Sequence, residues 1–172
     1  MSNQMVEKVA NEIDAVFEDM SMLPYLVGRD SFIQESIRKK YNKPSDYYSD
    51  EFNGDAWLFT INKYRENLSG IYVIGENGIT YCSQYYTFKN DITNNEQYRS
   101  VLYGDKQIWF PPSEGSHFVV TAGERLITLA APLKDIATGL NKGVIVCEVR
   151  EDKIKEFTNI GLGKKGFILL VD

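Results

Sequence analysis

The chain has 172 residues, of which 43% are hydrophobic, and this is enough for one packed domain with part of a second. Its net charge of -5 argues against a nucleic-acid partner, which requires a basic surface. There is no run of about 18 apolar residues and no leader pattern. We therefore expect membrane attachment only through anchors outside this sequence.

The N-terminal segment is predicted to be a long helix. Apolar residues recur in steps of three and four until Pro24, and Gly28 ends the pattern. The opposite side of the helix is acidic and polar, so the apolar stripe should pack against a neighbouring domain or a second copy in a homodimer. The stripe consists of Met5, Val9, Ile13, Val16, Met20 and Leu23.

Two further helices are expected before the first strand. One runs from Asp30, a suitable N-cap, to about Lys40. The next begins near Ser49, where acidic residues suit the first turn, and closes at Gly70. Its apolar stripe is predicted to be Trp57, Ile61, Tyr64 and Leu68.

The pattern then changes to strands. Residues 71–74 and 79–84 flank Asn77-Gly78, a strong hairpin signal. A short helix is expected over 96–102, and a strand over 107–110 that Pro111 and Pro112 stop.

The remaining segments complete an α+β arrangement around an antiparallel sheet. Strands are predicted over 117–121, 125–133 and 143–149, followed by a helix over 151–157 and an apolar strand over 166–171.

Nothing in the sequence predicts catalysis, a metal site or a cofactor. Cys82 and Cys147 lie in apolar strands without a nearby histidine, the chain has one histidine, and no nucleophile-elbow motif occurs. The glycine-rich stretch 161–166 lacks phosphate-loop spacing and precedes a strand, so a linker is the better interpretation. We therefore expect a binding domain with no enzymatic activity.

Three segments resemble a Cache domain, the PAS-related sensor module of bacterial histidine kinases and chemoreceptors. They are the hairpin 71–81 and the runs 126–135 and 142–149, preceded by the long helix. Residues 166–172 resemble the first strand of a second, membrane-proximal module. The resemblance thus implies a membrane-distal Cache module over 1–160, then a linker and a truncated second module over 161–172.

The resemblance implies a five-stranded antiparallel sheet of order 2-1-5-4-3, with a ligand pocket between the sheet and the helix and loops that follow strand two. In that order one strand separates Cys82 from Cys147, which places them about 10 Å apart. A disulfide needs Cα atoms within about 7 Å, so both thiols should be free.

Some family members bind amino acids, and their motif maps partly onto this chain. By resemblance, Tyr98 stands near the motif tyrosine, Trp109 or Phe110 near a strand-three tyrosine, and Glu148 where an aspartate would stand. Asn95 and Gln97 occupy the places of the motif's arginine and tryptophan, and Arg99 or Arg125 could replace that arginine. The expected ligand-binding residues are Tyr81, Tyr98, Arg99, Trp109, Arg125 and Glu148.

Two interpretations of Glu148 and of the domain stay open. An acid on an apolar strand either pairs with an internal arginine or awaits a cationic ligand group.

The function implied is extracytoplasmic sensing of a small molecule (an amino acid, an amine or an organic acid) on the extracellular side of a bacterial membrane. The receptor is expected to be a histidine kinase in preference to a chemoreceptor. The alternative is a ligand-free structural or dimerisation module whose pocket its own side chains fill.

Overall fold

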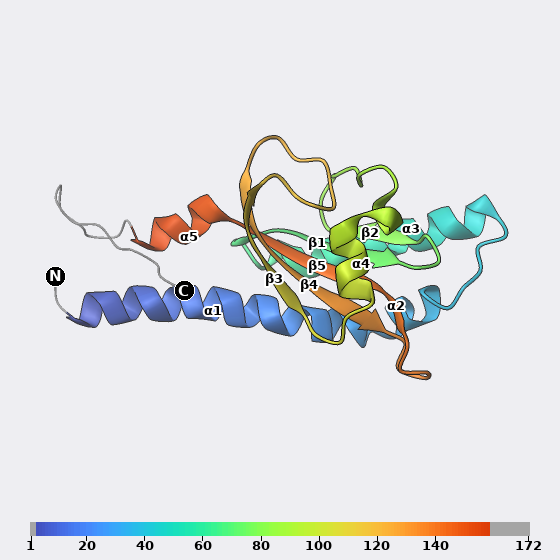
Figure 1. Cartoon of the computed structure of the whole chain (residues 1–172), viewed down its shortest axis with the longest axis horizontal. Coiled ribbons are helices and arrows are strands. Elements are labelled where there is room, and N and C mark those ends of the chain that lie inside the picture. Colours follow the sequence, from blue (N-terminus) through green and yellow to red (C-terminus); the bar gives the residue numbers. More distant parts are fainter. Residues whose placement is uncertain (1–2, 159–172) are drawn as a thin grey trace.

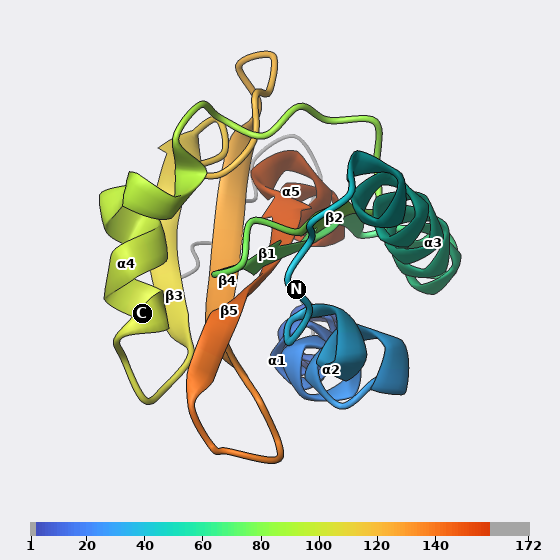
Figure 2. The same cartoon turned by 90° about the vertical axis from the view of Figure 1, so that its right-hand side faces the viewer.

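The computed structural model describes residues 3–158, so the expected linker and second-module strand at 161–172 lie outside the described residues. A twisted five-stranded sheet forms the centre, with helices on both faces (Figures 1 and 2). Over the described residues, no helix combines the length and the apolar character that a membrane span requires.

The sheet has the strand order β2-β1-β5-β4-β3, and every neighbouring pair is antiparallel. Val73 of β1 pairs with Tyr81, and Ile71 with Cys147, so β1 lies between β2 and β5 as expected. This confirms the predicted α+β class and the PAS-like order. The strands are β1 (Leu68–Gly75), β2 (Thr80–Cys82), β3 (Ile108–Glu114), β4 (Arg125–Lys134) and β5 (Asn141–Arg150).

One face of the sheet, which we call the α1 face, is covered by α1 (Asn3–Gly28), α2 (Ser31–Ser36) and α3 (Pro44–Lys63) (Figure 2). The stripe of α1 packs against the domain itself, because Val9, Ile13 and Met20 are buried in the core of this face. The prediction of a one-sided helix is therefore confirmed, and α1 continues through Pro24 to Gly28.

The second and third helices differ from the prediction. Asp30 caps α2 as expected, accepting hydrogen bonds from Phe32 N at 2.9 Å and Ile33 N at 3.2 Å, but the helix ends at Ser36. Helix α3 begins at Pro44 and ends at Lys63. Of its predicted stripe, Trp57 and Ile61 are partly buried against the α1-face core and Tyr64 is exposed. The buried side of the helix is a narrow, mostly polar stripe beside them. That stripe consists of Asp50, Gly54, Leu58 and Asn62, and Leu68 already belongs to β1.

The other face, which we call the α4 face, is covered by η1 (Ile92–Asn94), α4 (Glu96–Leu102) and two loops, 83–91 and 115–124 (Figure 2). The predicted strand over 117–121 is wrong, because this segment lies in loop 115–124 and forms only one bridge, Phe88 to Val119. Strand β3 continues through Pro111 and Pro112 by an irregularity, which a sheet edge tolerates. Helix α5 (Glu151–Thr158) follows β5 and contacts α1.

Candidate functional site

A fully buried carboxylate, that of Glu148, lies on the α4 face of the sheet. Three hydroxyl groups donate hydrogen bonds to it. Ser116 Oγ lies 2.6 Å and Thr128 Oγ1 3.2 Å from Glu148 Oε1, and Tyr72 Oη lies 3.1 Å from Oε2. The expected internal arginine is therefore not the partner of Glu148, and the three hydroxyls stand in its place.

The strand register brings two of these hydroxyls to Glu148. Thr128 of β4 is its direct cross-strand partner, and Gly70 of β1 is its partner on the other side. A Cβ at Gly70 would lie 2.3 Å from Tyr72 Oη, so the glycine leaves the space that the Tyr72 hydroxyl occupies. The absence of a side chain at position 70 thus allows Tyr72 to reach the carboxylate.

The third hydroxyl comes from loop 115–124. This loop lies beside loop 83–91 (Figure 1). Two backbone hydrogen bonds join the loops, from Lys89 N to Phe118 O at 2.9 Å and from Val120 N to Thr87 O at 2.8 Å. Phe118 is fully buried in the core of the α4 face. The two loops therefore cover the part of the α4 face where Glu148 lies.

The pKa of the Glu148 carboxyl is raised, chiefly because burial disfavours its charged form. The hydrogen bonds from Ser116, Tyr72 and Thr128, and the positive charge of Lys89, act in the opposite direction. None of the ion pairs found between residues 3 and 158 includes Glu148. In the same range no group of acidic, cysteine or histidine side chains is arranged to hold a metal ion.

Of the expected ligand residues, only Tyr98 shares the α4 face with Glu148. Its side chain extends from α4 into the core of that face, and its buried hydroxyl has no hydrogen-bond partner in the described structure. Tyr81 lies on the α1 face, in contact distance of the Phe32 ring, whose centroid is 5.8 Å away. Because Val73, its partner on β1, belongs to the same core as Tyr81, this assignment follows from the register.

The other three residues also lie away from Glu148. Arg99 is exposed, and its guanidinium lies 6.0 Å from the centroid of the Tyr103 ring. Arg125 pairs with Glu151 of α5 at 3.0 Å. Trp109 lies on the α1 face, where its ring makes an edge contact with Phe17, with centroids 5.3 Å apart.

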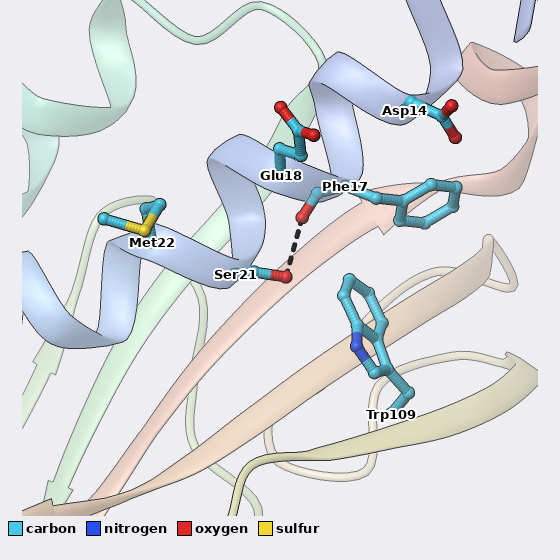
Figure 3. Close-up of a pocket in the computed structure, with 6 residues that line it drawn as sticks. All are labelled: Asp14, Phe17, Glu18, Ser21, Met22 and Trp109. Carbon is cyan, nitrogen blue, oxygen red and sulfur yellow. Dashed lines mark hydrogen bonds between the residues drawn. The ribbon is translucent and has the colours of Figure 1, made fainter. Parts of the chain in front are cut away.

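Trp109 instead lines an open groove of about 650 Å³ between α1 and β3 (Figure 3). The groove is formed on α1 by Asp14, Phe17, Glu18, Ser21 and Met22. The six expected residues therefore do not line one cavity. The alternative strand-three residue, Phe110, is the one on the α4 face, where its ring lies 6.3 Å from Phe118.

Sequence reasoning missed Ser116, Thr128, Tyr72 and Gly70 as neighbours of Glu148. Thr128 could have been found from the predicted order, since it lies on the neighbouring strand directly opposite Glu148. Gly70 could not, because it was expected to end a helix and belongs to β1 instead. Ser116 could not, because it directly precedes the predicted strand 117–121, which does not form. The prediction about thiols is confirmed: both cysteines are free, with Cys82 in the α4-face core and Cys147 in the α1-face core. Burial raises the pKa of Cys82 to about 11.

Comparison with solved structures identifies the fold. The sensor domain of the V. cholerae histidine kinase DctB has a TM-score of 0.65 at 16% identity, with 92% of this chain and 58% of that chain covered. The ligand-binding domain of the Pseudomonas aeruginosa amino acid chemoreceptor PctC, solved with GABA, has a TM-score of 0.59 at 13% identity, covering 90% and 64%. That of the Pseudomonas fluorescens chemoreceptor CtaA, solved with L-serine, has a TM-score of 0.59 at 12% identity, covering 91% and 61%.

These similarities establish that the chain has the Cache-type, PAS-like fold of bacterial sensor domains. The chain spans about three fifths of the length of those three chains. No family model and no curated protein matches its sequence.

Proposed function

We propose that this chain, with its Cache-type fold, is the extracytoplasmic small-molecule-sensing domain of a bacterial transmembrane receptor, and that its ligand is an organic amine held by Glu148. The observation that carries the proposal is the carboxylate of Glu148, enclosed with hydroxyl donors but without an ion-pair partner in the described structure. A buried carboxylate of this kind gains most from a cation that shares its enclosure.

The surroundings of Glu148 favour an amine over an amino acid. A ligand carboxylate is usually held by an arginine, and Arg99 and Arg125 are engaged elsewhere. Aromatic rings border the site instead, with Tyr72 centred 6.3 Å from Tyr86 and 6.2 Å from Phe88. Such rings favour an organic cation, and the unpartnered hydroxyl of Tyr98 offers a further polar group on the same face.

The receptor context extends this proposal. We propose a histidine kinase output, which the higher TM-score of the DctB domain supports over the chemoreceptor domains. The domain would lie on the extracellular side of the membrane. We also propose a homodimer through α1. Met22, Tyr25 and Leu26 of that helix are exposed and are available for such a contact. Sedimentation velocity would test it.

A specific observation favours the second candidate, a ligand-free structural module. Glu148 is fully buried and its oxygens already accept three hydrogen bonds, so the side chains of the chain itself close the site. This candidate requires that no small molecule binds at Glu148. It differs from the sensor in that respect alone, so a binding experiment separates the two.

The test uses three compounds that share one side group. Phenethylamine carries only the amine, phenylalanine adds a carboxylate, and 3-phenylpropanoate has the carboxylate alone. Butylamine, norvaline and pentanoate form a smaller matched set. By calorimetric titration we expect the amines to bind more tightly than the amino acids, and the acids not to bind.

The matched variant is Glu148→Gln, which keeps the shape and removes the charge. It should weaken amine binding by roughly 2 kcal/mol or more, about thirtyfold in Kd. Equal amine affinity in both proteins would place the ligand elsewhere. Binding of neither set would support the structural module instead.

A further inference from the structure

We propose that residues 116–122 form a plug that fills the Glu148 site until a ligand displaces it, with the Ser116 hydroxyl in the place that the ligand's ammonium group takes. This inference rests on the proposed function and adds the regulation of that site. It explains how a carboxylate suited to a cation is enclosed by the protein's own groups.

The Ser116 hydroxyl connects the plug to the sheet. It donates its proton to Glu148 Oε1 at 2.6 Å and accepts hydrogen bonds from Phe118 N at 3.0 Å and Val119 N at 3.2 Å. These three bonds use the full hydrogen-bonding capacity of a hydroxyl. An ammonium N–H can donate to the same carboxylate oxygen, so a ligand amine and Ser116 compete for Oε1.

Phe118 supplies the apolar part of the plug. Its side chain is fully buried among the rings and aliphatic residues of the α4 face, with Phe110 at 6.3 Å between centroids. Loop 83–91 holds it there through the bond from Lys89 N to Phe118 O. When Phe118 leaves, it vacates an apolar space in the core of the α4 face, the face that carries the carboxylate, and such a space suits the hydrocarbon part of an organic amine.

Two glycines bracket the plug. Gly115 has a φ of +75° and Gly123 a φ of +72°, in the left-handed region that glycine adopts without a steric penalty. Residues between two such positions can change direction at both ends with small changes inside the segment. The plug thus has a left-handed glycine at each end, and Ser116 is its side-chain anchor to the sheet.

Competition between plug and ligand has a measurable consequence. A site that is open only part of the time binds with an affinity reduced by that fraction, so a weaker plug strengthens ligand binding. Removing a different hydroxyl from the same carboxylate should not do so. Thr128 provides this control, because it donates to the same oxygen but belongs to β4 and not to the plug.

The experiment compares Ser116→Ala with Thr128→Val, using phenethylamine as the probe and amide hydrogen exchange as the readout of the loop. We expect Ser116→Ala to speed exchange at Phe118 and Val119 at least tenfold without affecting Ile145 and Val73. It should also tighten phenethylamine binding about tenfold. Thr128→Val should leave exchange at Phe118 unchanged and should not tighten binding. Ser116→Thr keeps the hydroxyl and should restore wild-type behaviour.

The outcomes separate the two proposals. If phenethylamine binds the wild type and Ser116→Ala binds it equally or less tightly, the plug is overturned and the sensor function stands. If phenethylamine binds neither protein, the proposed function fails, and the plug fails with it. If Ser116→Ala does not fold, Phe118→Ala tests the apolar part in the same way, and unchanged or weaker binding in that variant overturns the plug.

Discussion

Ser116 and Thr128 donate hydrogen bonds to the same oxygen of Glu148, one from a loop at 2.6 Å and the other from the neighbouring strand at 3.2 Å. A carboxylate in the middle of the sheet is thereby connected to a loop that has no strand pairing apart from one bridge. Any change in the charge or hydrogen-bond partners of Glu148 should therefore alter the hydrogen bond that holds loop 115–124 to the sheet.

The first prediction concerns pH and Glu148. In the unfolded chain the carboxyl titrates at its ordinary pKa of 4.5, and in the folded chain at a higher pKa because it is buried. Below pH 4.5 it is protonated in both states. As the pH rises from there through the folded pKa, the unfolded chain loses the proton first, so stability falls.

Thermal unfolding from pH 4 upward checks this prediction by comparing wild type with Glu148→Gln. Other acids titrate in both proteins, so the difference in Tm isolates Glu148. We expect the wild type to lose stability relative to the variant as the pH rises through the folded pKa. A constant difference across the range would mean that Glu148 has an unshifted pKa.

The second prediction concerns Gly70. A methyl group there would displace Tyr72 Oη, so Gly70→Ala should cost about 1–3 kcal/mol of unfolding free energy. Tyr72→Phe alone should cost about 1 kcal/mol, because it removes one hydrogen bond to Glu148. In the double variant part of the clash is gone, so urea unfolding should give less than the sum of the two costs. Strict additivity would show that Gly70 does not act through Tyr72.

The third prediction concerns Gly54, which packs against the ring of Tyr81. Alanine in place of glycine usually stabilises a helix by about 0.5–1 kcal/mol. At Gly54 the new Cβ would lie 2.2 Å from a ring carbon of Tyr81, so we expect a loss of about 1–3 kcal/mol instead. Asn53→Ala, at the neighbouring exposed position, should be neutral or slightly stabilising. A more stable Gly54→Ala would contradict the packing of α3 on β2.

How far the sequence alone could reach is shown by α1 and by Tyr81. The 3-4 spacing of Val9, Ile13 and Met20 is a local signal, and the helix and its buried side were predicted correctly. Tyr81 was assigned to the ligand side by resemblance to the family, but the face that a residue of a short strand occupies depends on the register, and a shift of one residue reverses it. The pairing of Val73 with Tyr81 is a tertiary fact that periodicity does not contain.

Loop 115–124 shows a second limit. Its β-branched and aromatic residues have strand propensity, but the chain leaves the sheet there because Ser116 and Phe118 are held by Glu148 and by the core beneath. The long-range contacts that decide this join residues 32 positions apart. The sequence therefore indicated that Glu148 matters without indicating what surrounds it.

The fourth prediction uses two methionines on α1. Met20 is fully buried in the α1-face core, whereas Met22 is 63% exposed beside the groove in Figure 3. Met20→Ala should destabilise the domain by about 2–5 kcal/mol, because it leaves a cavity. Met22→Ala should change the unfolding free energy by less than about 0.5 kcal/mol. Equal costs in chemical denaturation would mean that α1 is rotated about its axis.

The measurement that tests the account most directly is the titration of the Glu148 carboxyl itself. The ¹³C resonance of its labelled side chain should report a raised pKa in the free domain. With saturating phenethylamine, the pKa should fall below the ordinary glutamate value, because the bound ammonium stabilises the charged form. If the amine binds and the Glu148 pKa does not move, the ligand's charge is held elsewhere and the proposed site is wrong.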